Sequence, residues 1–409
     1  MSSAKRYINK MLATCKSIAL PRYLANTPYS TFETFETTTD WTAGDGSRAT
    51  NTTEFRTGTQ SVKLTTPSGV VGFMSKTTNF ISNGRIRLSF YLHDALADHD
   101  YFSLSLSTDS GYTKAFYYAV VIHSYDFKLG WNTYEIYPEM WTVSGGAVWT
   151  DPIVRVRLRM TPKSGKVVNM SFDLGETSAV GIPLVMINFD DASVSIDTYA
   201  FPYLSRINAR ASFYLRTGWV GTNAAYITSK QLQKMYANGW SICNHTRNHS
   251  DLDTLSQADA QTEMLNGKTD LDSWYLNNTS SYLAYPGGLS NETVRAAAIA
   301  EGMLTGRCTN VNKLMPYLLT DDTYIFGVQD ISYTTSLATA KTYVDKAYNN
   351  NHITSLLFHS LVTGAPAAYQ WPVSDFQALM DYIYAYHMPF ITIDDYYKAQ
   401  SGIIRVPKG

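Results

Sequence analysis

The 409-residue sequence has few cysteines, no long apolar run and no excess of charge of either sign. Its three cysteines, Cys15, Cys243 and Cys308, are an odd number at wide spacings, which predicts neither a disulfide framework nor a cysteine zinc site. No run of about 18 uncharged apolar residues is present, so we expect no membrane span. The 33 basic residues nearly cancel the 34 acidic ones, and this balance argues against nonspecific binding to nucleic acid.

Apolar and aromatic residues are abundant in the sequence. Apolar residues make up 44% of the chain, and 30 tyrosines raise the aromatic share to 13%. The length predicts two or three domains with room for a sizeable core. Charged residues are only 16%, and a tyrosine-rich surface with little charge suits neutral polar ligands such as sugars.

Residues 1–29 form a basic segment in which residues 4–20 have helical apolar spacing, ended by Pro21. A signal peptide would carry an uninterrupted apolar stretch, but Lys10 and Lys16 interrupt it here. We expect an amphipathic helix or arm that packs either on its own chain or on a second copy, and in the second case it would form a homo-oligomer. Binding to a membrane surface or to a partner is the alternative.

Residues 30–178 alternate apolar and polar positions in short runs, for example at 86–92, 102–106 and 154–160. Glycine, asparagine, aspartate and serine separate these runs. This pattern predicts an all-β, jelly-roll-like sandwich of antiparallel strands. Such a domain is either a carbohydrate-binding module or a structural spacer, and the pattern does not decide between them.

Residues 179–409 alternate strand and helix patterns. The run Leu184–Phe189 is apolar apart from Asn188, as expected for a strand that is buried on both faces. Repeated β-α units build a parallel sheet or barrel whose chemistry lies at the carboxyl ends of the strands.

Two polar clusters follow predicted strands in this region. Asp190 and Asp191 come directly after the apolar run, and two adjacent carboxylates repel unless a cation binds one of them. His245 and His249 are four residues apart, a spacing that can bring two imidazoles to one cation. One carboxylate and two imidazoles make an open, catalytic type of divalent metal site. The alternatives are a helix-capping loop and two surface histidines.

Two further positions end predicted strands. The Pro-Gly-Gly turn at 286–288 exposes backbone N–H groups that could receive an oxyanion, although it could equally be only a turn. His359 is suited to general-acid chemistry, with a core histidine as the alternative. Asp394 and Asp395 also follow a strand, but they precede a helical pattern and are interpreted as its N-cap.

Taken in order, NFDD, HTRNH, AYPGG and LLFH resemble the successive motifs of the polysaccharide deacetylase family, the NodB-homology or family 4 carbohydrate esterases. The resemblance covers roughly residues 182–400, and AYPGG is similar to the branch that acts on poly-N-acetylglucosamine-like polymers. It implies an irregular (β/α) barrel of the NodB type and one divalent metal ion, most simply Zn²⁺.

The resemblance also implies roles for individual residues. Asp190 would be the general base and His359 the general acid, while Gly287 would help to hold the oxyanion. The metal ligands would be Asp191, His245 and His249. Tyr285 and Trp371 are our candidates for stacking against a sugar.

The sequence departs from the family pattern at several positions. Ala192 stands where many members have glycine, and Ala284 stands where many have an arginine that orients the base. No clear match exists for the aspartate that tunes the acidic histidine, and Asp330 is only a guess.

We therefore predict a metal-dependent hydrolase that removes acetyl groups, preferably N-acetyl, from a cell-surface or extracellular polysaccharide. The alternatives are an O-acetyl esterase on a capsule or xylan-like polymer, and a catalytically idle carbohydrate-binding or virion protein. The predicted place of action is outside the cell, with delivery on a virion as one route.

Overall fold

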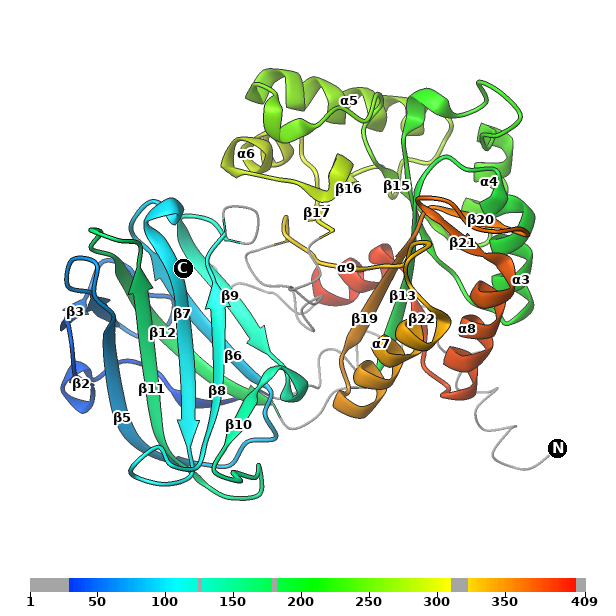
Figure 1. The fold of residues 1–409 in the computed structure, drawn as a ribbon. Helices are drawn as coiled ribbons and strands as arrows, with labels where there is room; N and C mark the ends of the chain where they lie inside the picture. Colours follow the sequence, from blue (N-terminus) through cyan, green and yellow to red (C-terminus); the bar gives the residue numbers. More distant parts are fainter. Residues whose placement is uncertain (1–28, 124–126, 179–181, 310–322, 402–409) are drawn as a thin grey trace. The chain divides into compact units, whose positions relative to one another are not determined.

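The structure is a computed structural model that describes residues 29–123, 127–178, 182–309 and 323–401 (Figure 1). The helix predicted over residues 4–20 lies outside the described part of the chain. The described residues divide into two compact units, one that ends at residue 178 and one that begins at residue 182.

The first unit is a sandwich of two antiparallel sheets. One sheet has the order β3-β4-β12-β6-β9, with β1 also paired to β12. Its strands are β1 (Tyr29–Glu33), β3 (Ser47–Asn51), β4 (Ser61–Thr65), β6 (Ile86–Leu92), β9 (Gly130–Ile136) and β12 (Asn169–Ser178). The other sheet has the order β10-β8-β7-β11-β5-β2, with β11 between β5 and β7 (Figure 1). Its strands are β2 (Thr42–Ala43), β5 (Gly72–Phe80), β7 (His99–Ser107), β8 (Ala115–Val121), β10 (Thr142–Ser144) and β11 (Ile153–Pro162).

The sandwich core comes from the alternation seen in the sequence. Ile86 and Leu88 of β6 are at most 1% exposed, whereas Arg87 between them is only partly buried. The Phe90 ring lies 4.8 Å from that of Phe102 on β7, so side chains from both sheets meet in one core. The predicted all-β antiparallel unit is confirmed.

The second unit is built on a parallel sheet of order β17-β16-β15-β14-β13-β19-β18, with β22 also paired to β13. Its strands are β13 (Leu184–Asp191), β14 (Ser212–Leu215), β15 (Ser241–Asn244), β16 (Tyr282–Ala284), β17 (Thr305–Arg307), β18 (Gln329–Asp330), β19 (Ile353–Phe358) and β22 (Phe390–Ile391). This arrangement is a distorted, partly open (β/α) barrel, as predicted. Two short strands, β20 (Ser360–Val362) and β21 (Gln370–Pro372), pair separately.

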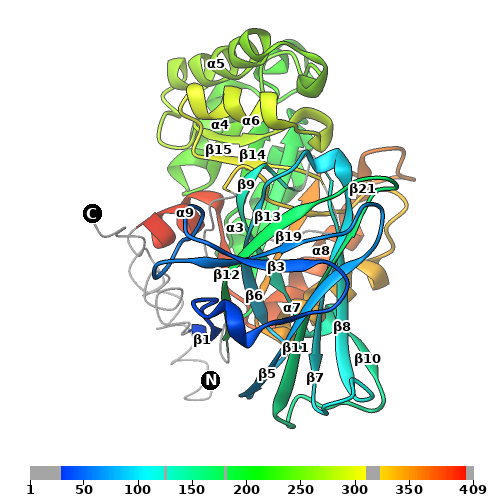
Figure 2. The ribbon, with the colours of Figure 1, turned by 90° about the vertical axis from the view of Figure 1, so that its left-hand side faces the viewer.

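Helices connect these strands. They are the π-helix η4 (Ile196–Ala200), α3 (Phe201–Arg206), α4 (Ser229–Ala237), α5 (Gln257–Ser273), α6 (Glu292–Ala300), α7 (Leu337–Asn350), α8 (Val373–Ala385) and α9 (Ile393–Ser401). The described 3-10 turns are η1 (Thr38–Asp40), η2 (Leu96–Asp98), η3 (Pro138–Met140), η5 (Thr217–Trp219), η6 (Leu252–Thr254) and η7 (Pro286–Gly288). α5 and α6 lie side by side (Figures 1 and 2) and share an apolar cluster through Met264 and Ala297.

The apolar run of β13 is buried on both faces. Ile187 and Phe189 pack with residues of α3, α4, α7 and α8, whereas Met186 packs in a separate cluster with Tyr214 and Tyr396. Because alternate residues of a strand face opposite sides, a strand between two cores needs an unbroken apolar run. This explains why β13 carries polar side chains only from Asn188 onward, toward its carboxyl end.

The N-cap predicted at Asp394 and Asp395 is wrong. Neither aspartate caps α9 directly: the Thr392 hydroxyl accepts from the backbone N–H of Asp395 at 3.2 Å, and Asp395 accepts in return from the Thr392 backbone N–H at 2.9 Å. The residue that begins this capping arrangement is therefore Thr392, directly before the first residue of α9.

None of the helices in the described ranges is both long and apolar enough to cross a membrane.

We expect Phe90→Ala to lower the free energy of unfolding of the sandwich by about 3–5 kcal/mol, because it leaves a cavity between the sheets. Urea unfolding followed by near-UV circular dichroism measures this loss. Phe55→Ala is the control, since Phe55 is 38% exposed on the same unit and should change stability by less than about 0.5 kcal/mol. Equal losses in the two variants would contradict the assigned core.

Candidate active site

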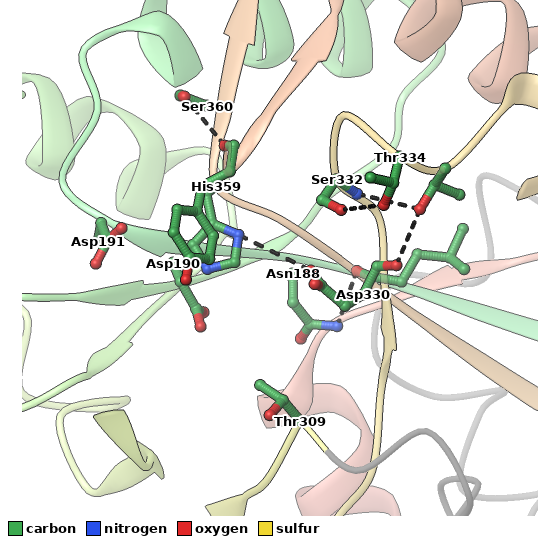
Figure 3. A network of polar contacts seen from close by, with 12 residues as sticks. Asn188, Asp190, Asp191, Thr309, Asp330, Ser332, Thr334, His359 and Ser360 are labelled. Carbon is green, nitrogen blue, oxygen red and sulfur yellow. Dashed lines mark hydrogen bonds and ion pairs between the residues drawn. The ribbon is translucent and has the colours of Figure 1, made fainter. Parts of the chain in front are cut away.

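Polar side chains gather at the carboxyl ends of the barrel strands. Asp190 and Asp191 end β13, His245 follows β15, and His359 follows β19. Figure 3 shows Asp190 and His359 next to each other, with Asp191 beyond them. Residues far apart in the sequence therefore meet at one edge of the sheet, where parallel α/β folds place their chemistry.

Three of these side chains form a cluster of ligand atoms. One atom each from Asp191, His245 and His249 lies within 4.8 Å of the other two. The Nε2 atom of His249 is 3.8 Å from Oδ1 of Asp191, and the two imidazole rings are nearly perpendicular at a centroid distance of 4.8 Å. This spacing lets the three groups reach a common point between them.

The backbone of Asp191 explains how two adjacent aspartates serve one site. In a regular strand their side chains would point to opposite faces. Asp191 has a φ of 71°, in the left-handed region that aspartate tolerates better than most residues. The alternation of β13 is therefore broken at its last residue.

His245 is oriented by a hydrogen bond at the far side of its ring. Its Nδ1 lies 2.9 Å from the carbonyl oxygen of Ala284, which can only accept, so Nδ1 carries the proton and Nε2 keeps a free lone pair. Burial lowers the pKa of His245 and outweighs the opposing charge of Asp190, which favours the neutral ring. A neutral imidazole with Nε2 free is the form that binds a metal ion.

The loop that carries His249 is held by helix α5. The backbone N–H of Asn248 donates to Glu263 at 3.0 Å, and the side-chain amide of Asn248 donates to the same carboxylate at 2.6 Å. Gly267 of the same helix allows close approach, because a Cβ there would lie 2.4 Å from Oδ1 of Asn244. The second histidine thus depends on contacts that its own motif does not contain.

The donor set fits a divalent cation. One carboxylate and two imidazoles are the ligands of open zinc sites, in which further coordination positions remain for water or substrate. His245 is 2% exposed, so the cluster lies partly below the surface.

Asp190 is buried beside this cluster and is paired with an arginine. Both of its carboxylate oxygens lie 2.5 Å from one terminal nitrogen of Arg307, the last residue of β17. Its Oδ2 is also 3.7 Å from Nε2 of His245. Burial alone would raise the pKa of Asp190, but the charge of Arg307, with smaller contributions from His245 and His359, lowers it overall. Asp190 is therefore held in its ionised form.

His359 faces Asp330 across the end of the sheet (Figure 3). The Nδ1 atom of His359 lies 4.0 Å from Oδ1 of Asp330, a residue of β18. Burial raises the pKa of Asp330 despite the opposing effect of His359. The ring of Tyr369 lies 5.1 Å from that of His359, and Tyr369 is 64% exposed.

Comparison with known proteins agrees with this geometry. A family profile described as "Polysaccharide deacetylase" matches residues 162–305. The barrel belongs to the polysaccharide deacetylase family. The poly-beta-1,6-N-acetyl-D-glucosamine N-deacetylase of Staphylococcus epidermidis is 32% identical over 135 residues, which cover 30% of this chain and 46% of that protein. Its Staphylococcus aureus counterpart is 32% identical over 124 residues, 26% of this chain and 41% of the relative. The chain thus spans less than half the length of these relatives.

Solved structures of deacetylases are also similar. The Streptococcus pyogenes deacetylase PplD in complex with acetate is 34% identical over 31% of this chain and 55% of its own, with a TM-score of 0.30. The Xyl-CE4 domain of a multidomain xylanase from the hindgut metagenome of Trinervitermes trinervoides is 16% identical over 54% of this chain and 92% of its own, with a TM-score of 0.37. These scores are low, and the fold assignment here rests on the strand order of the barrel.

The turn of the barrel after β16 has the conformation that glycine permits. Gly287 has a φ of 64°, and a Cβ there would meet nothing nearer than 3.9 Å, so the space beside it is open. Gly288 has a φ of 72°, and a Cβ there would collide with Thr309. The Thr309 hydroxyl donates to the carbonyl oxygen of Gly287 at 3.3 Å and ties the turn to the end of β17.

Two predicted substrate contacts are wrong. Tyr285 and Trp371 are each 1% exposed, so neither ring has a face free to stack on a sugar. The Tyr285 hydroxyl donates to the carbonyl oxygen of Tyr324 at 3.0 Å, and the Trp371 indole donates to that of Thr335 at 2.8 Å. Both are core residues whose polar atoms are satisfied internally, as large aromatic side chains in a barrel commonly are.

Arg307 is the residue that sequence reasoning missed. Ala284 on β16 occupies the position where the family pattern has an arginine. The guanidinium of Arg307, on the neighbouring strand β17, contacts Asp190 instead. The strand at Thr305–Arg307 is too short and too polar to show an apolar run. The signal that could have found it was the alternation of strands and helices along the barrel, because a strand is expected after α6, which ends at Ala300.

A separate concave region lies at the opposite end of the sheet. It has a volume of about 540 Å³ and is lined by residues that precede β14, β15 and β22, among them Asn208, Gly239 and Pro389. None of the clustered aspartates and histidines lines it.

We expect His245→Ala and His249→Ala each to weaken Zn²⁺ binding by more than the roughly 10–100-fold that loss of an outer-shell partner costs. Asp190→Asn should retain Zn²⁺, because Asp190 is paired with Arg307 and not part of the ligand cluster. Isothermal titration of the metal-free protein measures these affinities. His387→Asn, which changes an exposed histidine distant in the fold, is the control; unchanged affinity in both alanine variants would refute the ligand assignment.

Proposed function

We propose that the barrel hydrolyses acetyl groups from a polysaccharide, with a divalent ion held by Asp191, His245 and His249. The observation that carries the proposal is the buried, ionised Asp190, placed 3.7 Å from one of these ligands and outside the ligand set itself. A metal site with an ionised carboxylate beside it that is not itself a ligand has the parts that metal-assisted hydrolysis requires.

Asp190 acts as the general base in this proposal. When bound, the ion would lower the pKa of a water molecule and polarise the acetyl carbonyl. Asp190 takes the proton from the attacking water. Its lowered pKa makes it a weaker base but keeps it ionised over a wide pH range, and the acidified water needs only a weak base.

His359 acts as the general acid. Its ring lies at the same edge of the sheet as Asp190, and the carboxylate of Asp330 lies 4.0 Å from its Nδ1. In this proposal Asp330 orients the ring from the Nδ1 side, and His359 gives the proton on Nε2 to the departing amine. The backbone N–H of Gly287 stabilises the oxyanion in this proposal.

We further propose that the acetyl group removed is N-linked. The names of the two staphylococcal relatives, which are N-deacetylases of poly-β-1,6-N-acetyl-D-glucosamine, support this choice. Polymers of this class lie outside the cell membrane, so we propose that the protein acts there, free or carried by a virion.

We expect Asp190→Asn to lower the rate of acetate release from N-acetylglucosamine oligomers by about 10²–10⁴-fold, the share that a general base contributes. Acetate is measured with an enzyme-coupled assay on Zn²⁺-loaded protein. Asp381→Asn, an exposed carboxylate on α8, is the control and should be fully active.

Acetylated xylan, tested in parallel, separates the two linkages. Release from xylan alone would replace the N-linked proposal with an ester substrate. Full activity of Asp190→Asn on either polymer would remove Asp190 from the role of base.

We expect Arg307→Gln to move the acidic limb of the pH profile of kcat/KM to higher pH. Removing the positive charge raises the pKa of Asp190, so the base becomes protonated at pH values where the wild-type base is still ionised. Arg307→Lys keeps the charge but loses the guanidinium geometry, so its limb should stay near the wild-type position while kcat falls. If Arg307→Gln binds Zn²⁺ normally and its limb does not move, Arg307 does not control Asp190.

A further inference from the structure

The second sandwich sheet carries a row of arginines on one face. Arg155, Arg157 and Arg159 alternate along β11 with Val156 and Leu158, which are 4% and 0% exposed in the core. Because side chains alternate across a strand, all three arginines project from the outer face of the sheet. β11 is an inner strand, paired to β5 and β7 on its two sides, so the row runs through the sheet and not along its edge (Figure 1).

The strands beside this arginine row supply no compensating charge. The residues directly opposite the three arginines are neutral: Ser103, Ser105 and Ser107 on β7, and Phe73, Ser75 and Thr77 on β5. In the part of the chain that the structure describes, none of the three guanidinium groups has a carboxylate within 4 Å. The Nε atoms of Arg155 and Arg157 are buried and make no hydrogen bond within the described ranges.

Aromatic rings and one carbonyl group hold the row in place. The guanidinium of Arg157 lies 3.9 Å from the ring centroid of Tyr112 and 5.0 Å from that of Phe73. Arg155 lies 5.6 Å from the Tyr112 ring and donates to the carbonyl oxygen of Ser110 at 3.2 Å. These contacts orient the cations without neutralising them.

Unpaired arginines in a row are costly, unlike the paired arginines elsewhere in this protein. Arg87 pairs with Glu176, and Arg307 with Asp190. Residues two apart on a strand are about 7 Å apart, so neighbouring cations of the row repel each other. An anionic ligand laid along β11 would remove this repulsion and satisfy the free N–H groups.

We propose that the arginine row binds an acidic polysaccharide through its carboxylate groups. The planar guanidinium pairs with carboxylates in a two-bond geometry. The hydroxyls of Ser105 and Thr77, which are partly or fully exposed beside the row, can hydrogen-bond to sugar hydroxyls, and the partly exposed rings of Tyr112 and Phe73 offer apolar contact. A polymer rich in free amines would be repelled. The choice of a polysaccharide among polyanions rests on the function proposed for the barrel.

The test uses the full chain and polygalacturonate as the probe in affinity electrophoresis and calorimetry. We expect wild-type protein to bind it, and the double variant R157Q/R159Q to bind at least about tenfold more weakly, since it loses two charge-assisted contacts. The variant R157K/R159K should recover part of the affinity, because it restores charge without the planar fork. Thermal unfolding verifies that each variant is folded.

Two controls separate this surface from general charge effects. R48Q/K63Q removes the same charge from strands β3 and β4 of the other sheet and should bind like the wild type. Fully methyl-esterified polygalacturonate has the same backbone without carboxylates and should not bind. Equal binding of R157Q/R159Q and the wild type, or equal binding of the ester, would overturn the proposal. Tighter binding of double-stranded DNA than of polygalacturonate would replace it with a nucleic-acid surface.

Failure of this proposal is distinguishable from failure of the barrel's proposed function. Acetate release from short N-acetylglucosamine oligomers depends on the barrel and should be equal in R157Q/R159Q and the wild type. Binding with no acetate release would leave the arginine row intact and remove the reason for choosing a polysaccharide substrate. Acetate release with no binding would remove the row and leave the deacetylase function standing.

Discussion

The buried ion pair between Asp190 and Arg307 is the contact on which the candidate active site of the barrel depends. A carboxylate that is 2% exposed cannot stay ionised without a close positive charge, because burial disfavours the charged form. Arg307 supplies that charge and in turn needs Asp190, since it is 3% exposed itself. Removing either partner leaves the other as an uncompensated buried charge, which costs about 3–5 kcal/mol.

This pairing also keeps the carboxylates of the DD motif in separate roles. With Asp190 held by the guanidinium, Asp191 remains for the histidine cluster, and its left-handed backbone breaks the strand alternation there. Other residues of the site are also held by groups outside the motifs, namely a backbone carbonyl and a helix side chain. Ala284 holds His245, and Glu263 holds the loop before His249. The site is thus fixed by the strands and helices around the motifs as much as by the motifs.

The protein uses arginine in two opposite ways. In the barrel, Arg307 is buried, paired and turned toward one carboxylate of its own chain. In the sandwich, the arginines of β11 share no described carboxylate and are flanked by hydroxyl groups. A balanced net charge of −1 hides this difference, because composition averages over the positions of the charges. Only the pairing of each residue shows which charges are internal and which are available to a ligand.

The sequence by itself determined the elements whose pattern is local. Alternation fixed the faces of strands such as β6 and β11, the apolar run identified β13, and four motifs at strand ends indicated the family and the residues that cluster. The guess that Asp330 faces His359 agrees with the structure, although its motif was not evident.

Tertiary structure alone decided which side chains reach one another. Arg307 lies on a three-residue strand without an apolar run, and its partner is 117 positions away in the chain. The residue types of Tyr285 and Trp371 do not show whether their rings line a groove or fill a core. Burial depends on the neighbours that pack around a ring, and these come from distant parts of the sequence. Contacts between distant segments have no local signature. The cluster of Asp191, His245 and His249 could therefore be predicted from motifs in the sequence, whereas the pairing of Asp190 with Arg307 could not.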